Sequence, residues 1–274
     1  MAHKHASPTQ RTAPSVRTPN PPKRSHGVLS WVLQIFGELA ITVGLVLLLF
    51  VAWQLWWTNL EADSTQQHAV DSLSQEFKAQ AQKEKDSDTK TSGNSADKTA
   101  KNWDPNNPPA IDEPAYGQAF GIAYIPRFGA TYQRPIAEGT GTDVLDTLGL
   151  GHYEKTAMPG QIGNFALAGH RQTNGAVLDA IEEIQNGDHI YVQTAQGYYT
   201  YTVYETKIVL PTDVDVIAPN PANPSAKPTE RLLTLTTCHP RYGDKQRYIV
   251  HAKMESWQPL SAGAPEEINT AVGE

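Results

Sequence analysis

The longest apolar run of the chain lies near its start, from Leu39 to Trp57, and holds no charged side chain. At about 1.5 Å per residue, a helix of this length crosses the hydrocarbon core of a bilayer. A secretory signal peptide is the alternative, but its apolar core spans only about 7–15 residues and ends at small residues. This run ends in Trp53, Trp56 and Trp57, which is typical of an interfacial belt. The pattern predicts an uncleaved transmembrane anchor over residues 27–57.

The residues before this run are polar and basic. Residues 1–26 hold Lys and Arg but no Asp or Glu, and they are rich in Pro, Ser and Thr. Such a composition predicts a disordered tail. Because basic residues that flank a span stay in the cytoplasm, we expect a single-pass protein of the cell membrane with residues 58–274 outside the cell.

Two further segments are predicted to lie outside the folded part. Residues 58–115 are mostly polar, with 11 acidic and 6 basic side chains. Val70, Leu73 and Phe77 recur at helical spacing and predict a short helix over 69–82, and the remainder is predicted to be a flexible stalk. Residues 258–274 are predicted to be a short disordered tail.

Residues 116–257 alternate apolar and polar positions in the manner of β-strands, and they predict one mostly-β domain. The strand-like segments are 121–125, 164–168, 189–193, 198–207, 231–236 and 247–254. The only helical repeat inside this domain runs from Val177 to Ile184. A closed barrel would leave such a domain without exposed strand edges.

Cys238 is the only cysteine of the chain, so it cannot form an internal disulfide. It ends the β-branched run 232–237 and precedes His239-Pro240, which stops the predicted strand. A lone cysteine is commonly a buried apolar residue, and that interpretation stays open here. A thiol at a strand end can also face a cleft and act as a nucleophile.

A nucleophilic thiol needs a base or a positive charge beside it, because free thiols are weakly ionised at neutral pH. His170 is the best placed histidine, since it follows the predicted strand 164–169 as Cys238 ends its own. Four other histidines are less well placed, two inside predicted strands, one in a glycine-rich loop and one on the opposite strand face from the cysteine: His189, His251, His152 and His239.

Attack on a carbonyl also requires a group that stabilises the oxyanion. Arg247 opens the strand after the cysteine, and its guanidinium donates hydrogen bonds in a fixed fork. A solvated strand residue is the other interpretation of Arg247. Arg171 and Arg241 carry the same charge, but they lie in predicted loops, where we expect them to be less well fixed.

Other chemistry finds little support in the sequence. Cys238, His239 and His251 do not have the spacing of a closed zinc site, and no glycine-rich turn between a strand and a helix indicates a dinucleotide. Residues 116–257 hold 14 acidic and 11 basic side chains, which is unlike a nucleic-acid-binding surface. We therefore expect no metal, no cofactor and no nucleic-acid partner.

Three segments of the domain resemble the sortases, the membrane-anchored cysteine transpeptidases of Gram-positive bacteria. Thr234-Leu235-Thr236-Thr237-Cys238 resembles the TLxTC signature, residues 163–171 resemble the strand that bears the catalytic histidine, and residues 247–250 resemble the segment that bears the arginine. They occur in the order of the family. Residues 156–160 and 187–190 are also similar to sortase sequence, so the resemblance covers nearly all of 116–257.

This resemblance implies an eight-stranded sortase-type β-barrel with short helices. It implies that Cys238 is the nucleophile, His170 the general acid and base, and Arg247 the group that stabilises the oxyanion. The expected substrates are secreted proteins with a C-terminal sorting signal of the LPxTG type, cut between Thr and Gly through a thioester. The expected acceptor is an amine of the cell-wall precursor lipid II, or a pilin lysine in pilus-building members.

Within the family, Cys238-His239-Pro240 and the single N-terminal anchor look most like class E, which is associated with LAxTG-type signals. The pilus polymerases of class C usually add a C-terminal membrane helix, which residues 258–274 do not contain, and a lid with an Asp-Pro-Trp motif. Trp103-Asp104-Pro105 has those letters in another order. A membrane-tethered domain that binds peptides without cutting them is the remaining alternative.

Overall fold

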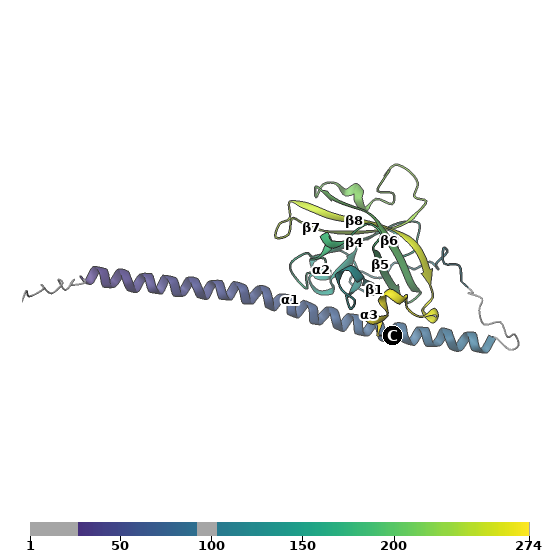
Figure 1. Ribbon diagram of the computed structural model, residues 1–274, viewed down its shortest axis with the longest axis horizontal. Helices are drawn as coiled ribbons and strands as arrows, with labels where there is room; N and C mark the ends of the chain where they lie inside the picture. The colour runs from purple at the N-terminus through teal and green to yellow at the C-terminus, as the bar shows by residue number, and fades with distance from the viewer. Residues whose placement is uncertain (1–26, 92–102, 274) are drawn as a thin grey trace, which may run out of the picture. The chain divides into compact units, whose positions relative to one another are not determined.

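The computed structural model describes residues 27–91 and 103–273, so the tail predicted for residues 1–26 lies outside the described part. Its longest helix, α1, runs from Val28 to Thr91. The chain divides into two compact units, residues 1–51 and 52–274, and each is described by itself. Helix α1 contributes to both units (Figure 1).

In the first unit, α1 is apolar and exposed along its whole length. Within Val28–Trp53, the most apolar window of 18 residues has a mean hydropathy of 2.5, and none of that window is buried against protein. Side chains such as Leu39 and Leu48 are exposed. A helix that is apolar on all sides and satisfies its own backbone hydrogen bonds is suited to lipid. By length and composition, this segment fits the expected membrane anchor.

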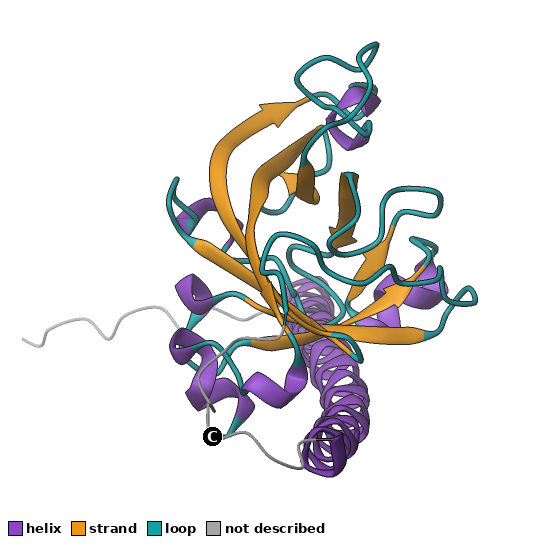
Figure 2. Ribbon diagram, turned by 90° about the vertical axis from the view of Figure 1, so that its right-hand side faces the viewer, coloured by secondary structure: helices purple, strands orange, loops and turns teal. Residues whose placement is uncertain are grey.

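The second unit is built around a closed barrel in the order β1-β2-β3-β4-β7-β8-β6-β5 (Figure 2). The eight strands are β1 (Ala119–Tyr124), β2 (Gln133–Glu138), β3 (Leu150–His152), β4 (Gly163–Gly169), β5 (His189–Thr194), β6 (Gly197–Val209), β7 (Arg231–His239) and β8 (Gln246–Gln258). The pairs β2–β3 and β4–β7 are parallel, and the others are antiparallel. The eight-stranded barrel that the resemblance implied is confirmed.

Two strands and one helix were not evident from the sequence pattern. Strand β2 contains Pro135, which lowers the strand signal, and β3 is only three residues long. Parallel strands need a crossover between them, and the helix α2 (Thr142–Leu148) supplies it between β2 and β3.

The helix predicted from Val177 to Ile184 is wrong in its type. The segment is a series of tight turns with hydrogen bonds between residues three apart, of which only Ile181–Glu183 forms a 3₁₀-helix, η2. Its apolar side chains are nevertheless buried in the main core. A segment this short makes few α-helical hydrogen bonds, so the burial of its side chains decides its shape.

Every second side chain of β4, β7 and β8 contributes to the barrel core, although most of the side chains between them in β4 and β7 are buried as well. Leu233 and Leu235 of β7 lie inside with Val250 of β8 and Phe165 of β4. Successive side chains of a strand point to opposite faces. The alternate positions of the same strands, including Cys238, therefore lie on the outer face.

Residues 58–91 do not form the free stalk that was expected, because α1 continues through them and packs on the barrel. Its buried side chains include Val70, Leu73 and Phe77, which form a second hydrophobic cluster with barrel residues such as Ile122. Full burial of one such side chain contributes about 1.5–3 kcal/mol. The short helix predicted over 69–82 is confirmed as part of this longer one.

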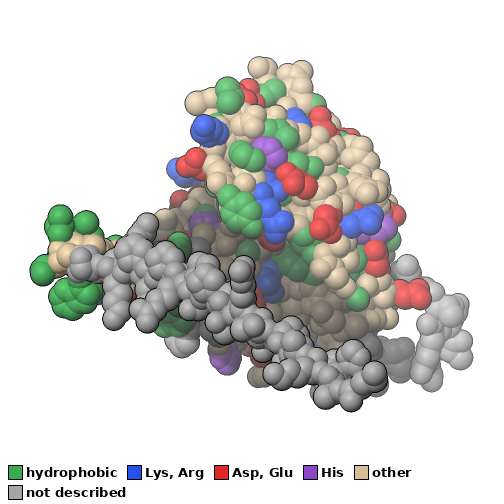
Figure 3. Space-filling view, turned by 60° about the vertical axis from the view of Figure 1, so that its left-hand side comes forward, with side chains coloured by type: hydrophobic (Ala, Val, Ile, Leu, Met, Phe, Trp, Pro, Cys, Tyr) green, Lys and Arg blue, Asp and Glu red, His purple; other side chains and the backbone are tan. Residues whose placement is uncertain are grey.

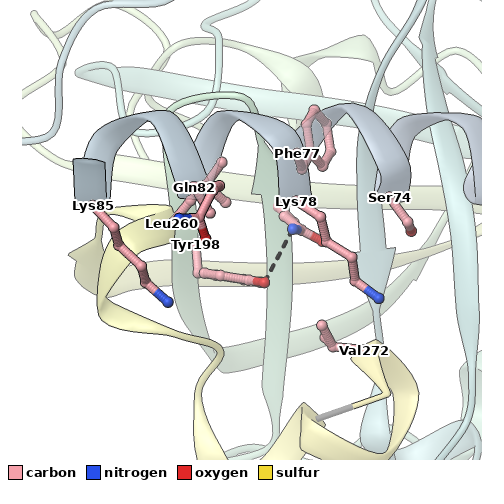
Figure 4. A pocket seen from close by; sticks show the side chains of 10 residues that line it. Ser74, Phe77, Lys78, Gln82, Lys85, Tyr198, Leu260 and Val272 are labelled. Carbon is pink, nitrogen blue, oxygen red and sulfur yellow. Dashed lines mark hydrogen bonds between the residues drawn. The ribbon is translucent and has the colours of Figure 1, made fainter. Parts of the chain in front are cut away.

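A cavity of about 200 Å³ lies at one end of the contact between α1 and the barrel (Figure 4). Phe77 and Lys78 of α1 face Tyr198 of β6 across it, and the Tyr198 hydroxyl accepts a 3.0 Å hydrogen bond from Gln193 Nε2. Lys85, further along α1, is exposed at its edge. The packing is thus tight around Val70 and opens toward Lys85.

The segment that leads into the barrel is also held. Trp103 packs against the main core, the backbone N–H of Trp257 donates to the Pro105 carbonyl at 2.8 Å, and Gln161 Nε2 donates to the Ile111 carbonyl at 3.1 Å. Each bond joins this polar, Pro-rich segment to a residue far away in the sequence. Residues 103–115 therefore lie along the barrel, where the sequence predicted a flexible linker.

The end of the chain likewise differs from the predicted disordered tail of residues 258–274. Three short helices follow β8: η4 (Leu260–Ala262), η5 (Glu266–Ile268) and α3 (Asn269–Val272). Leu260 and Ile268 are buried in the cluster that holds α1. These two side chains order a segment whose composition alone is that of a tail.

Candidate active site

The three residues singled out from the sequence lie at the same end of three adjacent strands. Cys238 of β7 and Arg247 of β8 are direct partners in the antiparallel ladder. Strands β4 and β7 are parallel, with Ala168 paired to Thr236, so His170 comes level with Cys238 two residues further on. Figure 1 shows β4, β7 and β8 in the barrel wall. The fold thus brings together a thiol, an imidazole and a guanidinium.

Alternation decides which face these groups share. Residues directly opposite each other in an antiparallel pair project to the same face, so Cys238 and Arg247 share one. Cys238 is half-buried, and the side chain of His170 is 26% exposed. Figure 3 shows one face of the molecule, on which charged side chains of both signs, histidine and apolar groups gather. The thiol is accessible, which is not so for a cysteine packed in the core.

The outer face of β4 and β7 next to Cys238 carries small side chains. Thr234 and Thr236 of β7 alternate with the core leucines and adjoin Ala166 and Ala168 of β4. The Tyr153 hydroxyl lies 3.0 Å from Thr236 Oγ1, at the edge of this surface. All four small side chains are nevertheless buried, with exposed fractions of 0% for Thr234 and Ala166, 5% for Thr236 and 7% for Ala168.

A cavity of about 370 Å³ lies near this surface, in the loop between β6 and β7. Asn164 Nδ2 of β4 donates to the Val216 carbonyl of that loop at 3.3 Å, and Asn164 Oδ1 accepts a 2.8 Å hydrogen bond from Thr234 Oγ1. Val216 also lines the cavity. This loop therefore covers Asn164 and Thr234, which are 1% and 0% exposed.

His170 has a partner that sequence reasoning missed. Its Nε2–H donates to Asp146 Oδ1 at 2.6 Å, and Asp146 belongs to α2, which the sequence pattern did not predict. A carboxylate on one ring nitrogen fixes the tautomer and the orientation of an imidazole. The other nitrogen, Nδ1, binds none of the described residues and is left to exchange a proton.

Arg171 is held far more firmly than its place in a loop suggested. Only 2% of the residue is exposed, and its Nη2 lies 2.7 Å from Glu182 Oε2. Its Nη1 donates to His239 Nδ1 at 3.0 Å and to the Cys238 carbonyl at 3.4 Å. The hydrogen bond from Arg171 lowers the pKa of Glu182. The expectation of a poorly fixed Arg171 is therefore wrong. Its guanidinium donates a hydrogen bond to the backbone carbonyl of Cys238.

Arg247 is fixed through one nitrogen only. Its Nη1 donates to the carbonyls of Asp244 and Gln246, at 2.7 and 2.9 Å. A guanidinium has five N–H donors, and within the described chain the other two nitrogens of Arg247 have no partner. They are available to an oxyanion or a peptide carbonyl. Arg241 is exposed and binds Asp179, as expected for a loop residue.

The remaining histidines serve the fold. His152 belongs to β3 and is fully buried, and its Nδ1–H donates to Glu138 Oε2 at 2.6 Å, so it does not border the thiol. Burial raises the pKa of that carboxyl.

His189 lies 2.8 Å from a carboxylate oxygen of Glu267. His251 is buried, and burial lowers its pKa to about 4. In the part of the chain that the structure describes, no group of three or more His, Cys, Asp and Glu side chains is arranged to hold a metal ion.

Comparison with known proteins defines the class. The family model described as the sortase domain matches residues 123–255. Sortase SrtE2 of Streptomyces coelicolor is 31% identical over 243 residues, which cover 85% of this chain and 85% of the relative. The chain therefore belongs to the sortase family.

The relatives also indicate the subgroup. Sortase SrtE1 of Streptomyces coelicolor is 34% identical over 252 residues, covering 89% of this chain and 63% of the relative. The SrtA sortase from Actinomyces oris has a TM-score of 0.57 at 43% identity, over 59% of this chain and 93% of that one. A structure of Sortase E1 from Streptomyces coelicolor with a tripeptide in the active site has a TM-score of 0.52 at 38% identity, over 56% and 97%. Within the family, the chain is class E-like.

Proposed function

We propose that the chain is a membrane-anchored cysteine transpeptidase that cuts a C-terminal sorting signal between Thr and Gly. The observation on which this rests is the common level of His170, Cys238 and Arg247 on adjacent strands. A nucleophile, a base oriented by a third group and an oxyanion donor are the parts that covalent acyl transfer needs.

In the first half-reaction, the thiol proton of Cys238 passes to His170, and Cys238 Sγ attacks the carbonyl carbon of the Thr residue of the signal. The carbon–sulfur bond forms, and the charge that develops on the carbonyl oxygen is stabilised by Arg247. When the peptide carbon–nitrogen bond breaks, the imidazolium of His170 gives its proton to the leaving Gly amine. The product is a thioester on Cys238 and a free peptide that begins with Gly.

In the second half-reaction, an acceptor amine attacks the thioester carbon. Neutral His170 takes a proton from this amine, a new carbon–nitrogen bond forms, and the carbon–sulfur bond breaks to release Cys238. The thioester retains the energy of the broken peptide bond. No nucleotide is therefore needed outside the cell, where the basic residues before the anchor predict the barrel to lie.

We place the sorting-signal peptide at the ends of β4, β7 and β8, where Cys238 and His170 are only partly buried. In the structure of Sortase E1 from Streptomyces coelicolor, a tripeptide lies in the active site of that relative. On the class E resemblance we propose an LAxTG-type signal in preference to LPxTG, and an amine of lipid II or peptidoglycan as the acceptor.

A pilus-building role is the second candidate. It is favoured by Trp103-Asp104-Pro105, which has the three residue types of the class C lid motif in another order. Against it, the Pro105 carbonyl accepts its hydrogen bond from Trp257, near the end of β8 that is remote from Arg247. The contact gives this segment no lid-like position over the strand ends. Attachment to the cell wall is the better supported function.

The test uses the full chain in detergent micelles with LAxTG and LPxTG peptides. We expect cleavage between Thr and Gly, a hydroxamate when hydroxylamine is present, and no cleavage by Cys238→Ala. Cleavage by Cys238→Ala would contradict the assignment of the nucleophile. Peptide binding without any cleavage by the natural sequence would favour a tethered binding domain.

A further inference from the structure

The loop after His170 has an unusual backbone. Asn174, Gly175 and Ala176 follow each other with φ of 51°, 85° and 46°. Glycine adopts this region freely, but alanine does so only at a cost. Such backbone conformations persist only where surrounding contacts hold them in place. The contacts that hold this loop therefore also determine where the histidine just before it lies.

Helix α1 supplies two of these contacts from outside the barrel. Gln66 Nε2 donates to the Asn174 carbonyl at 3.2 Å, and the Gly175 N–H donates to Asn59 Oδ1 at 3.2 Å. Asn59 and Gln66 are about two helical turns apart and share one face of α1. Gln66 is 0% exposed. The bond to the loop satisfies its Nε2, whereas its buried Oε1 has no hydrogen-bond partner among the described residues.

Gln66 also lies against the end of α2. A Cβ atom on Gly149, which caps α2, would lie 3.1 Å from Gln66 Cδ, and a Cβ atom on Gly175 would lie 2.7 Å from Gln66 Nε2. Both glycines have positive φ and leave room for this one side chain. Helix α2 carries Asp146, which binds His170 Nε2. One side chain of α1 thus contacts both segments that fix the imidazole.

We propose that residues 59–66 of α1 position His170, with Gln66 as the central positioning residue. The inference rests on the proposed function, in which His170 moves the proton. In the chain, this part of α1 directly follows the apolar span. The helix that anchors the protein and the helix that places its imidazole are therefore the same.

Loss of the contacts made by Asn59 and Gln66 should slow turnover and leave peptide binding unchanged. The described hydrogen bonds of Asn59 and Gln66 reach the loop after His170 and not Cys238, so the affinity for peptide should not depend on them. A shift of about 1 Å in a reacting group can lower the rate as much as 10²-fold. We therefore expect kcat to fall and KM to stay.

The experiment measures kcat and KM of the full chain in detergent micelles on a sorting-signal peptide. Gln66→Ala and Asn59→Leu should lower kcat about tenfold or more and change KM less than about twofold. Asn59→Asp keeps an oxygen acceptor for the Gly175 N–H and should keep most of the activity. Gln75→Ala removes an exposed glutamine of the same helix and should behave as the natural sequence.

Unchanged kcat in Gln66→Ala would overturn the inference, and so would an equal loss in Asn59→Asp and Asn59→Leu. Hydrogen exchange of the 170–178 segment gives a readout that does not need catalysis. Faster exchange there in Gln66→Ala, but not in Gln75→Ala, supports the contact, whereas equal exchange in both overturns it. If the natural sequence cuts no peptide, the proposed function fails, and exchange alone decides this inference.

Discussion

His170 Nε2 lies 2.6 Å from Asp146 Oδ1, and the carboxylate comes from α2, the helix that links the parallel strands β2 and β3. The bond orients the imidazole from the side opposite Nδ1. Asp146 is itself 43% exposed, so it remains an acceptor in contact with water. We infer that Asp146 is a positioning residue for His170 in its proposed role as general acid and base.

Replacing Asp146 by Ala should lower kcat about tenfold to a hundredfold, because the ring loses its orientation during proton transfer. Asp146→Asn keeps an oxygen that accepts from Nε2–H and should lose less. KM should stay within about twofold in both variants, since the peptide does not touch this residue. Peptide cleavage measures both constants. Asp112→Ala, an exposed acid elsewhere on the barrel unit, is the control, and an equal loss there would contradict the role.

Arg171 should matter for stability as well as for activity. Arg171→Met removes the buried guanidinium that donates to His239 Nδ1 and to the Cys238 carbonyl, so the free energy of unfolding should fall by about 1–3 kcal/mol. Glu182 keeps its contact with His239 Nδ1 at 3.1 Å, and its side chain is 47% exposed. Arg241→Met removes an exposed ion pair with Asp179 and should cost less than about 1 kcal/mol. Denaturant unfolding of the full chain measures both. Equal effects of the two substitutions would mean that burial of Arg171 has no energetic role.

His251 should make the protein sensitive to acid. Its pKa is about 4 in the folded protein, against an ordinary value near 6.5, because burial disfavours the charged ring. The neutral ring has its full stabilising effect above about pH 6.5, and this is lost as the pH falls from about 6.5 to about 4. The total loss should be about 2–3 kcal/mol. Unfolding midpoints at several pH values measure it.

The matched variant is His251→Asn, which cannot gain a proton in this range. It should flatten the pH dependence between about pH 6.5 and 4 relative to the natural sequence. His251 Nδ1–H donates to Thr234 Oγ1 at 2.9 Å, but the buried Nε2 has no hydrogen-bond partner in the described part of the chain, so protonation would bury an unpaired N–H. Identical pH curves for both proteins would show that His251 is not the responsible group.

Phe77 should decide whether α1 stays on the barrel. The side chain is 2% exposed, and Phe77→Ala should cost about 3–4 kcal/mol of the packing between helix and barrel. The measurement is hydrogen exchange over residues 62–81, which should become faster. Glu76→Ala changes an exposed neighbour and should leave the exchange as it is. Rapid hydrogen exchange over 62–81 in the natural sequence would contradict the docking of α1 and support the free stalk that the composition suggested.

Much of the active-site region was predictable because its signals are local. The apolar span is recognisable from its length and from its lack of charged residues. The β-branched run before Cys238 and the strand before His170 show a period that only strands produce. The order of the three motifs then matched that of the sortases, which implied that these strand ends lie together. Arg247 followed from the same reasoning, since it opens the next strand and the ladder pairs it with Cys238.

The sequence by itself therefore determined the span, the strands around the reacting residues and the family. Tertiary structure alone decided the contacts that hold those residues: Asp146 on His170, the buried Arg171 under Cys238, and α1 against the loop that follows the histidine. The physical reason is distance along the chain. Burial of Phe77 and Ile268 depends on surfaces that exist only once the barrel has closed, so the apolar spacing around Phe77 predicted a helix but not where it docks.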